Sequence, residues 1–171
     1  MTVGVFQQIA EQLEQIALVG AQRDDRIVAM VPVDDLDADK VLVFLSRGGL
    51  MKRTELSEFS NPRAGGVIAA GVKKGDRILS VELSDRTAEI VLLTSGGRAI
   101  RFSEEDVSVM GRTARGVKGI DVKGGDHVVG MVMVRRDASV LTITDRGMGK
   151  RTPVSEFPLQ KRGGMGTLAL P

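Results

Sequence analysis

Short apolar runs rich in Val, Ile and Leu recur along the chain between clusters of Gly, Asp and Ser. Their length and β-branched composition are typical of strands. We therefore predict an all-β chain with strands at 26–33, 41–45, 78–83, 88–94, 97–102, 128–134 and 139–144. The alternation is strict at the fifth of these runs, where Ala99 and Arg101 fall on one face and Ile100 and Phe102 on the other. Polar residues between the runs predict tight turns at 84–87, 95–97, 135–137 and 145–147.

The runs belong to a repeat of roughly 50 residues, a period expected of propeller blades. Each copy has a basic strand, a turn such as Leu56-Ser57-Glu58-Phe59 or Val154-Ser155-Glu156-Phe157, and then a Gly-rich basic loop. A further marker follows the loop, Gly75-Asp76-Arg77-Ile78 in one copy and Gly125-Asp126-His127-Val128 in the next. The markers keep one order and delimit repeat units at 38–83 and 87–134, with incomplete units at 1–34 and 138–171. We therefore predict one partial domain, a propeller-like array of about three four-stranded blades.

Residues 1–19 fit two patterns. Phe6, Ile9, Leu13 and Ile16 have the spacing of a short amphipathic helix. In the repeat alignment, however, residues 10–13 match the Leu-Ser-Glu-Phe turn of the later copies. We favour the repeat interpretation, with one or two helical turns retained.

Charge is distributed unevenly, although the net charge is only +2. Residues 1–45 carry 3 basic and 8 acidic residues, a net of 3 − 8 = −5, whereas the remainder carries 21 basic and 14 acidic residues, a net of +7. The absence of Cys excludes disulfides and fits a reducing cytoplasm. No apolar run approaches membrane-spanning length. We expect a cytoplasmic protein that does not contact a membrane.

Several sites of chemistry are excluded or disfavoured by the residues present. The chain has one His, His127, and no Tyr or Trp, so a His-based metal site and a Tyr nucleophile are not expected. The acidic turn at 34–40 lacks the Gly and the final Glu of a calcium-binding loop, and residues 147–151 lack the spacing of a phosphate-binding P-loop. Ser103 followed by Glu104-Glu105-Asp106 indicates a helical cap rather than paired catalytic carboxylates. We therefore expect no catalytic residue, no metal and no cofactor in this chain.

The basic loops carry the candidate chemistry. Arg112, Arg115 and Lys118 are spaced three apart between glycines. Glycine lets a backbone approach a partner closely, and the planar guanidinium group suits phosphate oxygens. With few aromatic residues for base stacking, we expect contacts with the backbone of a duplex.

The motifs resemble the C-terminal domain of the gyrase A protein and of its topoisomerase IV counterpart. The resemblance is carried by residues 99–107 with 110–120, and by residues 149–157. It implies a β-pinwheel, a six-bladed propeller-like ring in which neighbouring blades exchange strands. It also implies a basic rim that bends duplex DNA, in an enzyme whose ATPase B subunit, cleavage tyrosine and remaining A subunit lie outside this chain.

On this basis we expect a DNA-binding rim built from Arg47, Lys52, Arg53, Arg63, Arg98, Arg101, Arg112, Arg115, Lys118, Lys150, Arg151, Lys161 and Arg162. The segment Gln160-Lys161-Arg162-Gly163-Gly164-Met165-Gly166 is similar to the gyrase box, with Lys for Arg and Met for Lys. Its place after two units indicates a degenerate copy in a later blade. The alternative function is a protein-interaction scaffold, in which the arginines serve loop structure.

Overall fold

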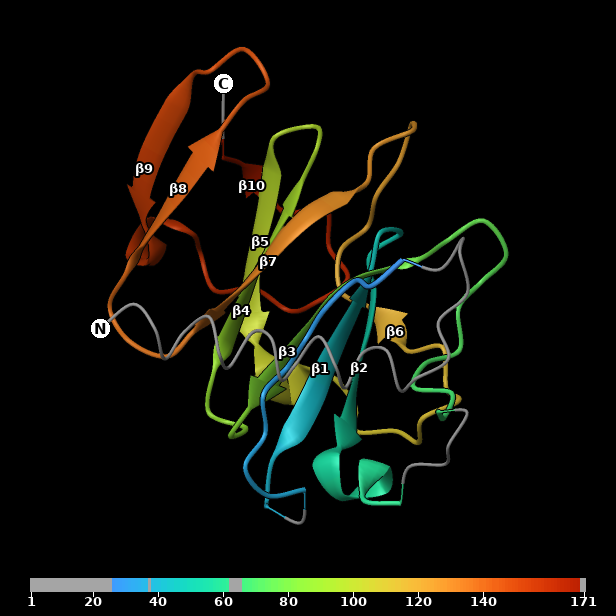
Figure 1. The fold of residues 1–171 in the computed structure, drawn as a ribbon. Helices are drawn as coiled ribbons and strands as arrows, with labels where there is room; N and C mark the ends of the chain where they lie inside the picture. Colours follow the sequence, from blue (N-terminus) through green and yellow to red (C-terminus); the bar gives the residue numbers. More distant parts are fainter. Residues whose placement is uncertain (1–25, 37, 62–65, 170–171) are drawn as a thin grey trace, which may run out of the picture.

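The computed structural model describes residues 26–36, 38–61 and 66–169 (Figure 1). Both interpretations of residues 1–19 therefore concern a segment outside the described residues. Within those ranges the chain consists of strands, turns and three short 3-10 turns, which confirms the all-β class. The same ranges contain no helix long and apolar enough to cross a membrane.

The longer strands form three hairpins, β1–β2, β4–β5 and β8–β9, and the strands predicted from the apolar runs between residues 41 and 144 are confirmed. The strands are β1 (Val41–Ser46), β2 (Leu50–Glu55), β3 (Ile78–Ser84), β4 (Glu89–Thr94), β5 (Arg98–Ser103), β6 (Val117–Lys118), β7 (Val128–Val134), β8 (Ser139–Ile143), β9 (Gly149–Pro153) and β10 (Thr167–Leu168). A 3-10 turn follows each hairpin: η1 (Leu56–Phe59), η2 (Glu104–Asp106) and η3 (Val154–Glu156). The turns predicted from the repeat at 56–59 and 154–157 are thus short 3-10 turns. The helical cap predicted at Ser103 is confirmed, since its Oγ accepts a hydrogen bond from the backbone N–H of Glu105.

The hairpins are the centres of three sheets that exchange strands. Blade 1 has the order β3-β1-β2-β6, blade 2 has the order β10-β5-β4-β7, and blade 3 is the two-stranded sheet β8-β9. Strand β6 follows the hairpin of blade 2 in sequence but pairs with β2 of blade 1, and β10 follows the hairpin of blade 3 but pairs with β5 of blade 2. All of these pairings are antiparallel, and the sheets remain open, as in a partial pinwheel.

The prediction of a strand at 26–33 is wrong. This segment is largely exposed and runs beside β3, and it pairs with none of the described strands (Figure 1). Its apolar, β-branched residues have the composition of a strand, but a strand exists only where a neighbouring strand supplies hydrogen bonds.

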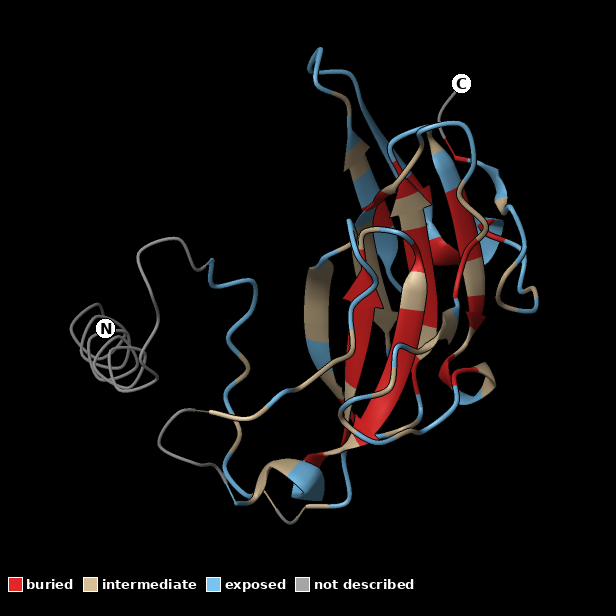
Figure 2. Cartoon of the chain, turned by 90° about the vertical axis from the view of Figure 1, so that its right-hand side faces the viewer, coloured by how far each residue is buried: buried red, intermediate tan, exposed pale blue. Residues whose placement is uncertain are grey.

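The hydrophobic cores lie between neighbouring blades, where the faces of the sheets stack (Figure 2). One core joins Val43 and Leu45 of blade 1 to Ile90, Leu92 and Phe102 of blade 2. The second joins the opposite face of blade 2, with Val91 and Ala99, to Val140, Val154 and Phe157 of blade 3. Each blade is therefore stabilised by its neighbours, as in other repeat arrays.

The Gly-Asp markers fasten each hairpin turn to the loop that leads into the next strand. Asp76 accepts hydrogen bonds from the backbone N–H groups of Gly48 and Arg77, each at 2.8 Å. Asp126 does the same for Gly96 and His127, each at 2.8 Å, and also accepts one from Ser95 Oγ at 2.7 Å. We call these two arrangements the Asp clasps. They explain why this marker recurs with the period of the blades.

Candidate nucleic-acid interface

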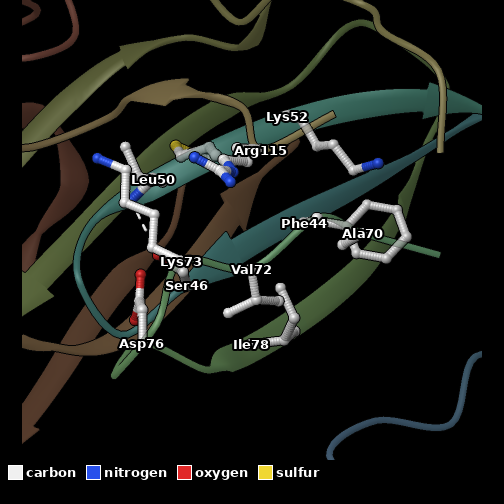
Figure 3. A pocket seen from close by; sticks show the side chains of 12 residues that line it. Phe44, Ser46, Leu50, Lys52, Ala70, Val72, Lys73, Asp76, Ile78 and Arg115 are labelled. Carbon is white, nitrogen blue, oxygen red and sulfur yellow. Dashed lines mark hydrogen bonds between the residues drawn. The ribbon is translucent and has the colours of Figure 1, made fainter. Parts of the chain in front are cut away.

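Three of the basic residues expected on the rim have charged groups that bind inside the array, two of them buried and one half-buried. Lys52 is the first. Lys52 is only 2 % exposed, so the prediction that it contacts DNA is wrong. The ammonium donates to the carbonyl oxygens of Ala69, Gly111 and Arg112 at 2.9, 3.1 and 2.5 Å. It also lies 4.9 Å from the centre of the Phe44 ring, and Figure 3 shows both side chains. Desolvation is the main reason that the pKa of Lys52 lies below its usual value. An ammonium enclosed in this way cannot meet a phosphate.

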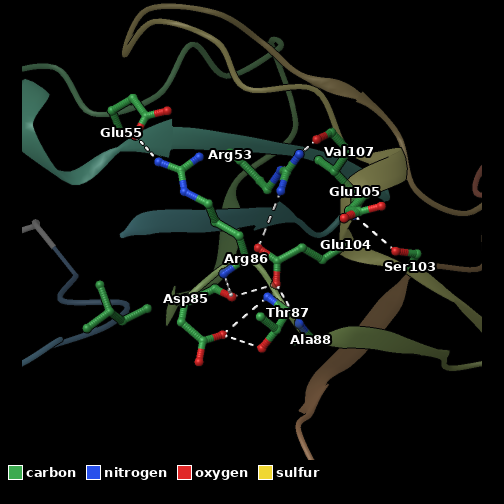
Figure 4. Close-up of polar contacts among 12 residues, drawn as sticks. Arg53, Glu55, Asp85, Arg86, Thr87, Ala88, Ser103, Glu104, Glu105 and Val107 are labelled. Carbon is green, nitrogen blue, oxygen red and sulfur yellow. Dashed lines mark hydrogen bonds and ion pairs between the residues drawn. The ribbon is translucent and has the colours of Figure 1, made fainter. Parts of the chain in front are cut away.

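Arg53 is the second residue whose predicted contact with DNA is wrong. It is 8 % exposed, and it joins blade 1 to the turn that follows the hairpin of blade 2 (Figure 4). Its Nε donates to the carbonyl oxygen of Val107 at 2.7 Å, and its Nη1 lies 3.5 Å from Oε1 of Glu104. Glu104 is fully buried, and its other carboxylate oxygen accepts hydrogen bonds from Ser84 Oγ at 2.5 Å and from the backbone N–H of Ala88 at 3.2 Å.

Arg101 occupies the position of Arg53 in the next blade and has the same role. Its Nη1 donates to the carbonyl oxygens of Val154 and Phe157 at 3.1 and 3.2 Å, and its Nη2 lies 2.6 Å from Glu89. The guanidinium thus joins blade 2 to blade 3. The periodicity of the sequence could have suggested this role, since an Arg recurs at the same strand position in all three hairpins.

Exposed basic side chains gather instead around the turns at one end of blades 1 and 2. An open groove of about 450 Å³ between these turns is lined by four cationic side chains. Two of them, Arg47 and Lys118, belong to the expected set. The other two, Lys73 and Lys74, were not expected. Their signal was present in the sequence, because a basic residue also precedes the Gly-Asp marker in the next copy, at Lys123.

The acidic residues of this groove are engaged in internal contacts. Asp76 and Asp126 form the Asp clasps, and Asp121 lies 2.7 Å from the ammonium of Lys118 and 3.3 Å from that of Lys123. Hydrogen bonds from these two lysines are the main reason that the pKa of Asp121 lies below its usual value. Arg47, Lys73 and Lys74 take part in none of the ion pairs among the described residues. Lys73 and Lys74 are exposed, and Arg47 is half-buried.

The Gly-rich loop of blade 2 divides its three basic residues between two roles. Arg115 is exposed and belongs to no ion pair of the described residues, and the ammonium of Lys118 is also accessible. Arg112 is half-buried, with its Nε 3.9 Å from Glu58. Arg115 and Lys118 are therefore better placed than Arg112 to contact a ligand.

The segment similar to the gyrase box forms the corresponding loop of blade 3. Arg162 is held internally, since its Nε donates to the carbonyl oxygen of Asp106 at 2.6 Å and its Nη1 to that of Lys118 at 3.1 Å. Lys161 is exposed and lies 2.8 Å from a carboxylate oxygen of Asp106. The backbone N–H of Gly163 donates to the carbonyl oxygen of Gly119 at 2.7 Å, so this loop packs directly on the preceding one.

The other described residues that were expected to contact DNA are exposed. Arg98 donates to the carbonyl oxygen of Gly166 at 3.1 Å and is otherwise open to solvent. Lys150 and Arg151 occupy in blade 3 the positions of Lys52 and Arg53, yet both are exposed. Arg63 lies outside the described residues. Exposure, rather than sequence position alone, separates the contact candidates from the structural arginines.

The comparisons with known proteins agree with this architecture. The family described as "DNA gyrase C-terminal domain, beta-propeller" matches residues 40–85, 88–135 and 138–170. The gyrase A protein of Salmonella typhimurium is 36% identical over 155 residues, which cover 91% of this chain and 18% of the relative. The gyrase A protein of Halalkalibacterium halodurans is 43% identical over 111 residues, 65% of this chain and 13% of the relative. The chain thus spans less than a fifth of these relatives.

Two solved structures share the fold. The C-terminal domain of DNA topoisomerase IV superimposes with a TM-score of 0.83 at 30% identity, over 89% of this chain and 48% of that one. The C-terminal domain of DNA gyrase A superimposes with a TM-score of 0.77 at 27% identity, over 89% of this chain and 50% of that one. The order of strands, the exchange between blades and these similarities lead to one conclusion: the chain belongs to the family of DNA gyrase C-terminal domains.

Proposed function

We propose that this chain is a non-catalytic DNA-binding domain from the A subunit of a type II DNA topoisomerase, which bends duplex DNA along its exposed basic loops. The observation that carries the proposal is the groove between blades 1 and 2, where cationic side chains converge and the neighbouring carboxylates are engaged internally. We expect the DNA contacts to come from the basic residues that are not enclosed in the array. These are Arg47, Lys73, Lys74, Arg98, Arg115, Lys118, Lys123, Lys150, Arg151 and Lys161.

The chemistry of such a surface is that of a phosphate binder. Lysine and arginine side chains replace the counterions that condense on DNA, and the released ions supply much of the affinity. Contacts with phosphates position a duplex without reading its bases, so we expect weak sequence selectivity. Bending costs elastic free energy, which additional contacts along the curve offset.

In this proposal the catalytic steps belong to other parts of the enzyme. The chain would act in the cytoplasm, together with the ATPase B subunit, the cleavage tyrosine and the other domains of its own protein, and would present bent DNA for ATP-dependent supercoiling. Neither a cofactor nor a metal is required for the binding of a phosphate backbone by arginine and lysine.

The test is a titration of duplex DNA with the chain at several salt concentrations. Energy transfer between dyes at the two ends of the duplex measures how far the DNA is bent. Replacing Arg47 and Arg115 with Ala should weaken binding to all sequences alike and flatten the slope of log affinity against log salt by about one to two. Arg136→Ala is the matched control, because Arg136 is exposed in the turn after β7, at the end of that strand away from the groove. Negligible binding of the unaltered chain at low salt, or a partner protein that binds at high salt without competition from DNA, would favour the scaffold function instead.

A further inference from the structure

The Gly-rich loops of blades 2 and 3 contain equivalent turns, at 111–114 and 161–164. Each turn rests on the preceding loop in the same way. The backbone N–H of Gly71 donates to the carbonyl oxygen of Ala114 at 3.1 Å, and that of Asp121 donates to the carbonyl oxygen of Gly164 at 2.8 Å. These contacts join described residues to one another, so chain added at either end would leave them unaltered.

The peptide group at the centre of the turn has opposite orientations in the two loops. In blade 3 the backbone N–H of Gly163 points inward and donates to the carbonyl oxygen of Gly119 at 2.7 Å. In blade 2 the carbonyl oxygen of Arg112 points inward instead, and it accepts a hydrogen bond from the ammonium of Lys52 at 2.5 Å. Because the C=O and N–H of a trans peptide point in opposite directions, the N–H of Thr113 faces away from Lys52.

The backbone angles agree with this inversion. In blade 2 the N–H of Ala114 donates to the carbonyl oxygen of Gly111 at 3.1 Å, and neither Arg112 nor Thr113 has a positive φ, so the turn is of type I. Gly163, at the position of Thr113, has a φ of 87°, as the third residue of a type II turn requires. The two types differ in the orientation of the central peptide. A β-branched residue would be strained at the φ of Gly163, so each turn has a residue that suits its type.

Lys52 takes the place of the inward N–H group. The carbonyl oxygen of Ala69 is equivalent to that of Gly119, yet it accepts its hydrogen bond from the Lys52 ammonium, at 2.9 Å, and no backbone N–H of the described residues donates to it. The residue equivalent to Lys52 in blade 2 is Ile100, a fully buried apolar side chain without a donor. A buried ammonium needs acceptors, so Lys52 favours the turn that directs the Arg112 carbonyl group inward.

The turn of blade 2 consequently presents N–H groups to solvent. Within the part of the chain that the structure describes, the N–H groups of Arg112, Thr113 and Arg115 donate no hydrogen bond. Thr113 and Arg115 are also exposed. In blade 3 the outward group is instead the carbonyl oxygen of Arg162, which accepts no hydrogen bond from a described residue. Backbone N–H groups bind phosphate oxygens, whereas a carbonyl oxygen repels them.

We propose that the N–H groups of Arg112 and Thr113, next to the exposed side chain of Arg115, bind a phosphate group of duplex DNA, and that Lys52 is the positioning residue that turns these N–H groups outward. The inference rests on the proposed function, because it names one phosphate contact of the DNA-binding surface. Lys52 does not touch the phosphate, and its buried charge acts through the peptide that it binds. The equivalent turn of blade 3 presents a carbonyl group and is not such a site.

The first experiment follows backbone amide protons by NMR in the whole 171-residue chain. Without DNA, the amide proton of Thr113 should exchange rapidly with water and that of Gly163 slowly, because only the second is hydrogen-bonded inside the array. On addition of duplex DNA, the Thr113 proton should move downfield as it binds a phosphate oxygen, while the Gly163 proton should shift less. A protected Thr113 amide in the free chain would overturn the proposal, whatever the chain binds.

The same titration separates this site from the proposed function. If the chain binds duplex DNA while the Thr113 amide does not shift, the phosphate site is wrong and the proposed function stands. If the chain binds no DNA, both are wrong. Inorganic phosphate, added at constant ionic strength, is the second probe. A saturable shift of Thr113 at millimolar phosphate, without a response to DNA, would assign the site to a free anion and overturn the proposed contact with a duplex.

The second experiment removes the charge that holds the peptide. Lys52→Ile with Thr113→Gly introduces the two residue types that stand at the equivalent positions where blade 2 meets blade 3. We expect the central peptide to turn over, and duplex affinity to fall about tenfold relative to Thr113→Gly alone, which has the same loop but keeps Lys52. The slope of log affinity against log salt should change by less than the value of about 0.9 for one lost cationic contact, because neither Lys52 nor an N–H group replaces a counterion on DNA.

Phe44→Leu is the matched control for lost packing. The Phe44 ring lies 4.9 Å from the Lys52 ammonium but takes no part in the three carbonyl contacts. This variant should lose stability and keep its affinity for DNA. Equal affinities of Thr113→Gly and the double variant, both folded by circular dichroism, or an equal loss in Phe44→Leu, would overturn the positioning role. If the double variant does not fold, the exchange rate and the DNA-induced shift of the Thr113 amide in the unaltered chain still decide the proposal.

Discussion

At the scale of single residues, the Asp clasps connect acid sensitivity to the fold. Partial burial disfavours the charged form of Asp126, but hydrogen bonds from Thr94, Ser95 and the backbone N–H groups of Gly96 and His127 outweigh it and lower the pKa to about 2. The ordinary value, 3.8, applies once the chain unfolds. The unfolded chain therefore binds more protons between these two values, and the stability contributed by Asp126 is present above about pH 4 and is lost as the pH falls through about 2.

We predict that Asp126→Asn removes this acid dependence. At neutral pH the variant should lose about 1–2 kcal/mol of unfolding free energy, a value reduced for the partial solvent exposure of the clasp. The difference from the unaltered chain should shrink as the pH approaches 2. Urea unfolding at a series of pH values between neutral and about 2.5 checks this, with Asp76→Asn as the matched variant in the other clasp. A constant difference at every pH would show that the Asp126 charge is not responsible.

The buried pair of Arg53 and Glu104 gives a second prediction at this scale. Arg53→Met should destabilise the chain by about 3–5 kcal/mol, because it leaves a fully buried carboxylate without its cation. Replacing Glu104 with Leu in the same chain should recover part of the loss, since Leu56 and Val154 occupy the equivalent place in the other units. A double-mutant cycle by urea unfolding measures the coupling, and additive effects of the two substitutions would argue against a direct pair.

At the scale of structural elements, the exchanged strands depend on a glycine that introduces them. Gly116→Ala should destabilise the chain by at least about 2 kcal/mol, because it combines a left-handed backbone with a steric overlap on the Met51 carbonyl group. Gly111→Ala in the same loop is the control, since no atom lies near its Cβ position and its φ is not positive. Thermal unfolding of both variants makes the comparison, and similar melting temperatures would contradict the role assigned to Gly116.

The elements that could be predicted are those with a local signal. Strands β1, β3, β4, β5, β7 and β8 were predicted from apolar runs, whereas β2 and β9 were expected only as the basic strand of the repeat. The three 3-10 turns follow the recurring motif. The exchanged strands β6 and β10 were not predicted, because two residues are too short to show a period, and their pairing depends on a distant hairpin. The segment 26–33 has a strong strand signal but no strand partner among the described residues, so its composition alone led to the wrong result.

The residues of the candidate site also differ in whether the sequence alone could place them. Arg115 and Lys118 were expected on the rim because they lie between glycines in a loop, and both are exposed. Lys52 was misplaced because it occupies the core position that Ile100 has in the next blade, and only packing shows that carbonyl oxygens surround it. A basic residue in a strand can therefore be exposed, like Lys150, or bound inside the array, like Lys52, and the contact between blades determines which.

At the scale of the whole molecule, the array should be unequally stable along its length. Blade 2 is covered on both faces by cores, whereas most positions of β8 and β9 are exposed, and a two-stranded hairpin alone is marginal. We predict that hydrogen exchange is slowest in β4 and fastest among the hairpins in β8–β9. Exchange measured at low protein concentration tests this for the single chain, and uniform protection of the three hairpins would contradict it.

The exchange of strands also determines how such a chain can be divided or extended. Sequence units and hydrogen-bonded blades are out of phase, so a cut between two units removes the outer strand of one blade and leaves another strand without a sheet. Adding a unit to an open array completes one blade and creates a new incomplete one, and the number of unfinished edges stays the same. The free-energy penalty of the ends is therefore fixed, while the favourable contacts grow with each unit. Lengthening dilutes that penalty, but only closure into a ring removes it.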